Sequence, residues 1–334
     1  MRMVYQIEAR TLHFRNPAGT SRGVYTTRRV WYVTLSDGER RGVGECAPLP
    51  RLSADDLPNY EEVLHRMCRM VCQQGAIDTE ALRPYPSMLF ALECAWNLLH
   101  STELAPQTFL QGEVGIPING LIWMGSYDEM LTRLEEKMEA GFRCIKLKIG
   151  AINFDDECRL LERVRQRFSR QEVELRIDAN GAFSPEEALQ KLQRLAAFDL
   201  HSIEQPIRQG QWDAMAQLTD KTPLPIALDE ELIGVNQPAD KARLLDAIRP
   251  QYIILKPSLH GGLSGCDEWV RLAEERGIGW WATSALESNV GLTAIAHWCA
   301  AHNPCVPQGL GTGLLFTDNT PAHTVIRGDK LYAI

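Results

Sequence analysis

The sequence predicts an α/β protein whose main part is a parallel (β/α) barrel and whose first hundred residues form a smaller α+β region. Three observations predict this class. From about residue 110 onward, short runs rich in β-branched residues alternate with helical stretches. Ionisable residues close successive runs at intervals of one βα unit. Finally, Asn119-Gly120-Leu121 offers no Gly-rich fingerprint after the first run. An open doubly wound sheet, which usually carries such a fingerprint, is the structural alternative.

The N-terminal region combines a hairpin with two helices. Bulky and polar residues alternate over 30–35, Ser36-Asp37-Gly38 supplies turn chemistry, and a second run covers 42–47. Residues 54–75 and 86–100 predict helices, and in the second of these the apolar residues recur at the spacing of one helix face. This region therefore predicts a mixed α+β fold.

Residues 16–23 lie between the early strands and are rich in structure breakers, with few apolar anchors. They predict a mobile loop that closes over a bound ligand. The last residues, 315–334, are too few for a domain, and we expect them to pack on the N-terminal region. The predicted domains are accordingly an α+β domain of residues 1–110, completed by 315–334, and a barrel domain of residues 111–314.

Eight strands with helical crossovers are predicted in the barrel region. The strands lie at residues 116–118, 144–149, 173–177, 202–204, 225–228, 252–255, 279–282 and 305–307. Helices are expected over 127–140 and 185–198, for example. The second opens with Ser184-Pro185-Glu186-Glu187, which is an N-cap residue, a proline at the first helical position and acids in the first turn. Strands joined by helical crossovers run parallel, which favours the barrel.

Composition and charge exclude several classes of protein. The chain of 334 residues is 45% hydrophobic and 23% charged, as is typical of a globular protein. A net charge of −8 excludes nucleic-acid binding through a basic surface and argues against docking on anionic membranes. No apolar run approaches the roughly 20 residues of a membrane span, and from the first residues we expect no secretory signal. Nine scattered cysteines without a CxxC pair indicate neither a disulfide framework nor a zinc site, so we expect a cytoplasmic protein.

Ionisable residues at the predicted strand ends form the candidate catalytic group. In a parallel barrel the carboxyl ends of the strands meet at one face, where the chemistry takes place. Successive members from Lys148 onward are separated by 30, 26, 25 and 27 residues, so each βα unit returns to the same level of the barrel. The residues concerned are Lys146, Lys148, Asp178, Glu204, Asp229 and Lys256.

Three carboxylates that converge on one barrel mouth repel each other unless a cation lies between them. Mg²⁺ suits a site that offers three carboxylates, water and substrate. The alternative is that each acid forms a separate salt bridge or caps the following helix. A nearby Mg²⁺ and a second lysine both disfavour the protonated form of a lysine, which makes that lysine a base near neutral pH. A metal and a neutral lysine can together remove a proton α to a carboxylate, and the metal stabilises the enediolate that forms.

Five sequence strings carry a family resemblance: Ile145-Lys146-Leu147-Lys148, Arg176-Ile177-Asp178-Ala179-Asn180-Gly181, Ile203-Glu204-Gln205-Pro206, Ala227-Leu228-Asp229-Glu230 and Leu255-Lys256-Pro257-Ser258. Together they resemble the enolase superfamily, and within it the muconate-lactonizing-enzyme subgroup and its o-succinylbenzoate synthase family. The resemblance covers the whole chain. It implies a modified (β/α)7β TIM-like barrel with an α+β capping domain, and a Mg²⁺ cofactor for which Mn²⁺ can substitute.

The resemblance also implies a role for each residue at a strand end. Asp178, Glu204 and Asp229 would bind the metal. Lys148 would be the general base and then the acid for the leaving hydroxide, while Lys256 would stabilise the ring system from the opposite side. The implied substrate-binding residues are Lys146, Arg176, Asn180, Ser258, Ser284 and Gly311.

The activity implied is dehydration of 2-succinyl-6-hydroxy-2,4-cyclohexadiene-1-carboxylate to o-succinylbenzoate, a step of menaquinone synthesis. The alternatives are an N-acylamino-acid (N-succinylamino-acid) racemase, in which Lys148 and Lys256 would be paired acid and base, and a non-catalytic binding barrel. Glu287 follows the predicted seventh strand, and we expect it to have a structural rather than a catalytic role. The expected partner is a small carboxylate, with neither nucleic acid nor membrane. The sequence leaves the oligomeric state open.

Overall fold

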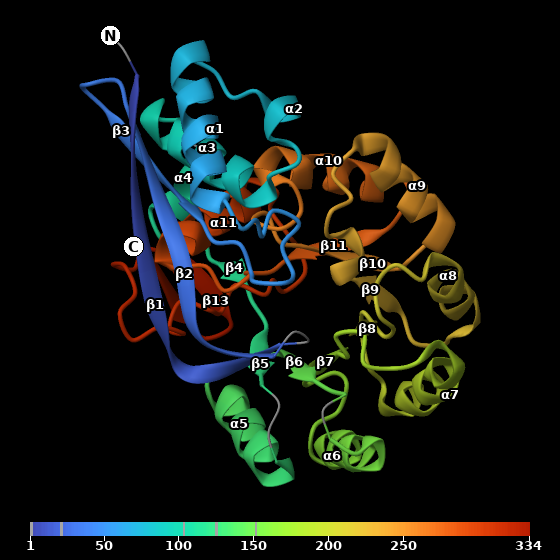
Figure 1. Ribbon diagram of the computed structural model, residues 1–334. Coiled ribbons are helices and arrows are strands. Elements are labelled where there is room, and N and C mark those ends of the chain that lie inside the picture. Colours follow the sequence, from blue (N-terminus) through green and yellow to red (C-terminus); the bar gives the residue numbers. More distant parts are fainter. Residues whose placement is uncertain (1–2, 21–22, 103, 124–125, 151) are drawn as a thin grey trace.

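A curled, seven-stranded parallel sheet forms the centre of the molecule (Figure 1). The computed structural model describes residues 3–20, 23–102, 104–123, 126–150 and 152–334. The seven strands lie side by side in chain order, and every neighbouring pair is parallel. They are β5 (Gly120–Ile122), β6 (Cys144–Lys148), β7 (Glu174–Asp178), β8 (Ser202–Glu204), β9 (Ile226–Leu228), β10 (Tyr252–Leu255) and β11 (Gly279–Ala282).

Helices connect these strands and pack outside the sheet (Figure 1). They bury one apolar face, as α7 does with Ala188, Leu192 and Leu195. The start of α7 confirms the predicted signal, because the Ser184 amide donates to Oε1 of Glu187 at 3.2 Å. The α-helices are α5 (Tyr127–Glu139), α6 (Phe154–Arg167), α7 (Pro185–Leu195), α8 (Trp212–Lys221), α9 (Pro238–Ile248), α10 (Gly262–Glu274) and α11 (Asn289–Ala301), with 3-10 turns at Ala196–Phe198 and Glu230–Leu232.

The first and last predicted strands of the barrel are wrong. The parallel sheet begins at β5, whereas β4 (Ile116–Pro117) pairs antiparallel with a C-terminal strand, and Pro117 has no N–H to donate to a second neighbour. No strand covers 305–307 in the part of the chain that the structure describes. Single parallel bridges instead join Gln308 to Ile118 and Gly309 to Thr283.

The N-terminal region confirms the predicted hairpin and helices. An antiparallel sheet contains β1 (Val4–Thr20), β2 (Gly23–Ser36) and β3 (Arg41–Cys46). It carries α1 (Tyr60–Gln74), α2 (Thr79–Leu82) and α3 (Pro86–Leu99), and α4 (Gln107–Leu110) leads to β4. Helix α3 lies directly on β3, because a Cβ at Gly44 would be 1.8 Å from the carbonyl oxygen of Ala91. Only glycine permits so close an approach.

The loop predicted over residues 16–23 is wrong where the structure describes it. Strands β1 and β2 continue through this segment, with Ala18 paired to Tyr25. The breakers Asn16 and Pro17 fall in an irregularity of the pairing between His13 and Ala18. Ala18 is 1% exposed and packs with Phe14 and Phe316, so the segment does have an apolar anchor. Residues 21 and 22 lie outside the described part of the chain.

The C-terminal segment contacts two parts of the molecule. Near its start, the Arg15 amide of β1 donates to the carbonyl oxygen of Leu315 at 2.7 Å, and Phe14 bridges to Phe316. Further on, β12 (Thr324–Arg327) and β13 (Lys330–Ala333) form a hairpin whose second strand pairs with β4. The C-terminal segment therefore contacts the N-terminal sheet and also β4, which precedes the first strand of the parallel sheet.

Two further features concern the chain as a whole. Among the described residues, no helix combines the length and apolar character that crossing a membrane requires. All nine cysteines are free thiols, and Cys305 is exposed whereas the others are buried or half-buried.

Glu93 of α3 is buried against the start of α10, where it accepts the Leu263 amide at 2.6 Å. Burial raises the pKa of Glu93 to about 7. The folded protein therefore retains a proton that the unfolded chain loses near pH 4.3, and the associated stability is lost as the pH rises through 7. We expect Glu93 to lower the free energy of unfolding by up to about 1.4 kcal/mol per pH unit between pH 5 and 7.

Urea unfolding at a series of pH values tests this expectation. Glu93→Gln removes the titrating group, so this variant should lose part of the decline in unfolding free energy over that range. The matched control is Glu162→Gln, at an exposed position of α6, which should keep the wild-type decline. An unchanged pH dependence in Glu93→Gln would refute the assignment.

Candidate active site

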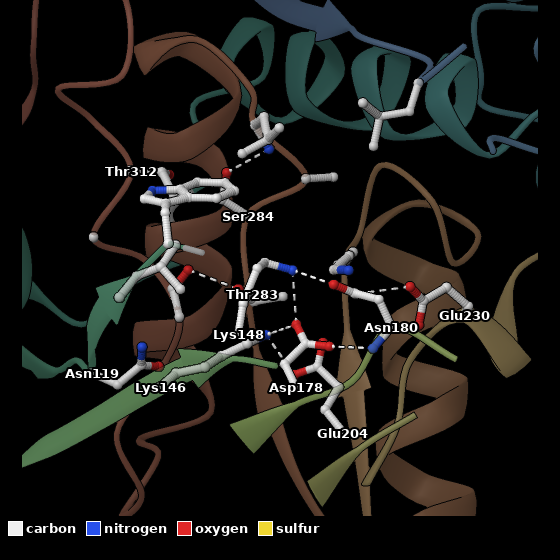
Figure 2. Close-up of a pocket in the computed structure, with 18 of the residues that line it drawn as sticks. Asn119, Lys146, Lys148, Asp178, Asn180, Glu204, Glu230, Thr283, Ser284 and Thr312 are labelled. Atoms are coloured by element: carbon white, nitrogen blue, oxygen red, sulfur yellow. Dashed lines mark hydrogen bonds and ion pairs between the residues drawn. The ribbon is translucent and has the colours of Figure 1, made fainter. Parts of the chain in front are cut away.

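Strand register brings the predicted acids and lysines to one level at the carboxyl ends of the sheet. Lys148, the last residue of β6, pairs with Asp178 of β7, and Asp178 pairs with Glu204 of β8. Asp229 and Lys256 directly follow β9 and β10. Figure 2 shows Lys146, Lys148, Asp178 and Glu204 directed toward one another in a pocket. The predicted convergence of these side chains is therefore present.

Lysine ammonium groups lie between the carboxylates. The Nζ atom of Lys146 is 2.8 Å from Oδ2 of Asp178 and 2.5 Å from Oε2 of Glu204. That of Lys148 is 3.0 Å from Oδ2 of Asp178, and Lys256 forms an ion pair with Asp229. The charges therefore form two groups of ion pairs, one of Lys146 and Lys148 with Asp178 and Glu204, and one of Lys256 with Asp229.

Burial and charge act differently on the carboxylates of Asp178 and Glu204 and on the ammonium group of Lys146. Burial alone would raise the pKa of Asp178, but the charges of Lys146 and Lys148 outweigh it and hold that pKa well below its usual range. Burial and the neighbouring charge of Asp178 raise the pKa of Glu204 well above its usual range. Burial lowers the pKa of Lys146, but the carboxylates outweigh burial and raise it. Charges of both signs are therefore concentrated at the strand ends, and each shifts the pKa of its neighbours.

The donor set fits a hard divalent cation. Oε1 of Glu204 and Oδ1 of Asp229 are buried and receive no hydrogen bond from the described residues. Uncompensated buried carboxylate oxygens are costly, and a divalent cation with oxygen ligands would compensate them. Within the described ranges no three acidic, histidine or cysteine side chains stand in a preformed metal cluster. In this structure the ammonium groups of Lys146 and Lys256 lie against the carboxylates and balance part of the same charge.

Apolar and charged side chains together line the pocket that contains these charges. Leu49 and Leu52 come from the N-terminal region, whereas Leu121 and Trp123 follow the start of the parallel sheet. The full lining contains Leu49, Leu52, Asn119, Leu121, Trp123, Lys146, Lys148, Asp178, Asn180, Glu204, Glu230, Lys256, Thr283, Ser284, Ala285, Leu286, Gly309, Gly311 and Thr312. A partly apolar ligand with a carboxylate matches this distribution.

The predicted substrate-binding residues divide into two groups. Lys146, Asn180, Ser284 and Gly311 line the pocket, and the Asn180 side chain accepts a hydrogen bond of 2.6 Å from Nζ of Lys148. Two others, Arg176 and Ser258, are not among its lining residues and need separate explanations.

Arg176 and Ser258 make buried structural contacts instead. Arg176 lies two residues before Asp178 on β7, hence one layer further from the strand ends. It donates to the carbonyl oxygen of Pro307 at 2.8 Å and stacks on Trp281. Ser258 donates to Oε1 of Glu287 at 2.5 Å. Neither side chain is positioned to meet a ligand in this pocket.

Glu230 lines the pocket but is not among the site residues predicted from the sequence. It follows Asp229, lines the pocket, and accepts a hydrogen bond of 3.0 Å from Nδ2 of Asn180 (Figure 2). Burial and the charge of Asp229 raise the pKa of Glu230 to about 7. Its signal in the sequence is a second acid directly after Asp229, at the same strand end.

Comparisons with known proteins agree with this arrangement. A model of the family described as "Enolase C-terminal domain-like" matches residues 129–325, and one described as "MenC, N-terminal domain" matches residues 20–99. The o-succinylbenzoate synthase of Desulfotalea psychrophila is 47% identical over 96% of this chain and 96% of its own.

Solved structures give the same result. The crystal structure of MenC from Desulfotalea psychrophila superposes with a TM-score of 0.87 at 42% identity and covers 100% of both chains. The o-succinylbenzoate synthase from Thermosynechococcus elongatus, solved with Mg in its active site, has a TM-score of 0.74 at 24% identity, with 91% of this chain and 92% of that chain covered. The chain therefore belongs to the enolase superfamily, in the group that contains the o-succinylbenzoate synthases.

Proposed function

We propose that the protein is an o-succinylbenzoate synthase, a hydro-lyase of menaquinone biosynthesis. Its substrate would be 2-succinyl-6-hydroxy-2,4-cyclohexadiene-1-carboxylate, which loses water to form o-succinylbenzoate. The observation that carries the proposal is the pair of lysine–carboxylate groups facing one pocket, in a chain 47% identical to a synthase of that name. Free cysteines throughout the chain agree with a cytoplasmic, reducing location, which we also propose.

Lys148 and Lys256 divide the chemistry between them in this proposal. The Nζ atom of Lys148, as the free amine, takes the proton from the carbon α to the carboxylate. The electrons of that C–H bond are first delocalised into the substrate carboxylate. They then form a ring double bond as the neighbouring C–O bond breaks, and the proton on Lys148 joins the leaving hydroxide as water. Lys256, on the opposite side, places positive charge beside the electron-rich ring. Asn180 holds Lys148 through the 2.6 Å hydrogen bond.

Asp178, Glu204 and Asp229 would hold Mg²⁺, with Mn²⁺ as a substitute. When bound, the cation supplies positive charge that stabilises the substrate carboxylate as it gains negative charge. Lys146, now 2.5 Å from Glu204, would then be available to bind a substrate oxygen. The carboxylate oxygens without donors on Glu204 and Asp229 support this assignment.

We also propose that the parallel sheet belongs to a (β/α)7β barrel covered by a capping domain. The barrel would comprise residues 111–314, and the cap residues 1–110 with 315–334. Support comes from the parallel bridges of Gln308 and Gly309, which continue the order of the sheet from β11 back toward Ile118. The location of Leu49 and Leu52 in the pocket lining supports a cap that supplies part of the active site.

Incubation of the purified protein with its proposed substrate and Mg²⁺ tests the function. The absorbance and mass of the product should show aromatic o-succinylbenzoate forming at a rate far above that of the uncatalysed reaction. Absence of product from folded, Mg²⁺-supplied protein would reject the proposal.

We expect the pocket to bind substrates with a free amino group only weakly. Gly309, Gly311 and Thr312, which line the pocket, offer no carboxylate to pair with an ammonium group. Burial of an unpaired ammonium costs several kcal/mol, so we expect dipeptides with free amino termini not to be epimerised. N-succinylamino acids, which lack that charge, should be racemised slowly, as an alternative activity of Lys148 and Lys256.

Deuterium incorporation at the α-carbon in D₂O measures both substrate types side by side. The rate for N-succinylamino acids should exceed that for free dipeptides. Faster deuteration of the free dipeptides would mean that the pocket near Gly311 recognises an ammonium group, contrary to the assignment.

A further inference from the structure

Arg28 of β2 links two segments of the active-site wall without being among the residues that line the pocket. The side chain is buried, and its Nη1 donates to the carbonyl oxygen of Pro48 at 3.1 Å. Its Nη2 donates to the carbonyl oxygens of Ala47 and Ala285, the latter at 3.2 Å. Ala285 lines the pocket, and so does Leu49, which follows Pro48 and packs in one cluster with Ala285. One guanidinium therefore joins wall segments that are far apart in the sequence.

Glu287 holds the same wall from its other side. Its carboxylate is fully buried and accepts from Oγ of Ser284 at 2.6 Å and from the amide of Ala285 at 2.8 Å. Its other oxygen accepts from Oγ of Ser258 at 2.5 Å. Ala285 is consequently fixed at its N–H by Glu287 and at its carbonyl by Arg28.

The held segment has a strained backbone. Leu286 lines the pocket with a φ of 66°, in the left-handed region that side chains with a Cβ disfavour. Such a conformation persists when surrounding contacts determine it, and here the Leu286 amide donates to Oγ of Ser284 at 3.0 Å. Two residues after Leu286, the Ser288 amide donates to Glu45 of β3 at 2.8 Å, which anchors Ser288 to the N-terminal sheet.

We propose that Arg28 and Glu287 are positioning residues, which fix the wall at Ser284–Leu286 and so set how tightly the organic part of the substrate is bound. The inference deepens the proposed function and rests on it. Among the described contacts, no hydrogen bond joins either residue to Lys148 or Lys256. Their loss should therefore weaken substrate binding while leaving proton transfer largely intact.

Two substitutions test this role. Arg28→Lys keeps the positive charge, but a single ammonium cannot span the three carbonyl oxygens that the planar guanidinium joins. Ser258→Ala removes one hydrogen bond to Glu287 and changes no residue of the pocket lining. We expect KM to rise about tenfold or more in Arg28→Lys and about threefold or more in Ser258→Ala, with kcat within about threefold of wild type. Hydrogen exchange of the amides of residues 284–287 should become faster in both variants.

The matched control is Ser87→Ala. Ser87 is also fully buried and donates to a carboxylate, that of Asp55 at 2.6 Å, but it does not line the pocket. This variant should lose thermal stability to a similar degree as Ser258→Ala, with KM and the exchange of residues 284–287 unchanged.

The outcomes separate this inference from the proposed function. Absence of synthase activity in the wild-type protein would contradict the proposed function. Hydrogen exchange needs no substrate, so it would still test whether Arg28 and Glu287 fix the segment Ser284–Leu286. Unchanged exchange at 284–287 in both variants, or a loss confined to kcat, would overturn the positioning role. An equal rise of KM in Ser87→Ala would overturn it as well.

Discussion

Lys148→Ala is expected to lower kcat by about 10²- to 10⁴-fold, the usual contribution of a positioned base. The Nζ atom of Lys148 lies among Asp178, Asn180 and the ring of Trp123, facing the pocket. Its removal deletes the proposed proton acceptor, but Lys146 still pairs with Asp178 at 2.8 Å, so no unpaired buried charge results there. Steady-state kinetics with the thermal midpoint of unfolding should show lost turnover in a folded protein.

Lys148→Arg distinguishes a base from a mere positive charge. Arginine retains the charge but does not lose its proton in proteins, so this variant should be nearly as inactive as Lys148→Ala. Lys191→Ala is the matched control, because Lys191 forms an ion pair of 2.9 Å with Glu187 on α7, outside the pocket lining. Full activity in Lys148→Arg would show that the charge of residue 148 matters and its basicity does not.

Exhaustive chelation is expected to lower turnover by roughly 10³-fold or more, because charge stabilisation by a cation is worth several kcal/mol. The protein itself should remain folded. Without a cation, Lys146 and Lys148 pair with Asp178, and Lys256 pairs with Asp229, so most of the buried charge stays compensated. Activity assays and circular dichroism before and after chelation measure the two effects.

Restoration by added metal completes that experiment. Mg²⁺ or Mn²⁺ should return turnover to the chelated protein and raise its thermal midpoint, since a ligand of the folded state stabilises it. Asp178→Asn removes the charge of a proposed metal ligand at nearly constant shape. The turnover of this variant should not be restored by added metal. Undiminished turnover after chelation would exclude metal-assisted chemistry, and unfolding on chelation would exclude the compensation by lysines.

The regular parts of the fold could be predicted because their signals are local. Ser184 and Pro185 mark the start of α7, and the turn at Ser36–Gly38 marks the end of β2. The register of the parallel sheet follows from chain order, so the convergence of Asp178 and Glu204 could be predicted as well. These features depend on spacing alone.

The errors occurred where tertiary contacts override local preference. Pro17 is tolerated within β1 because the pairing is irregular there and Ala18 is buried against Phe316. Pro117 ends the antiparallel pairing of β4, so the parallel sheet starts three residues later at Gly120. In both cases the proline correctly predicted an interruption of regular pairing. The sequence did not indicate which strand would contain that interruption.

The partners of buried side chains could not be predicted from sequence spacing. The family resemblance implies that Ser258 binds substrate, whereas its hydroxyl donates a hydrogen bond to the buried Glu287. Glu45 and Ser288 are 243 residues apart in the chain yet hydrogen-bonded. Nothing in the sequence indicates such a pair, which depends on how the N-terminal sheet lies against the parallel one.

Single-turnover aromatisation of a substrate deuterated at the carbon α to its carboxylate tests the central claim most directly, because product release does not limit such an experiment. If Lys148 removes that proton in the chemical step, the deuterated compound should react several-fold more slowly than the protonated one. Equal rates for the two compounds in the Mg²⁺-supplied protein would contradict removal of that proton as the rate-limiting chemical step, which is the step assigned to Lys148.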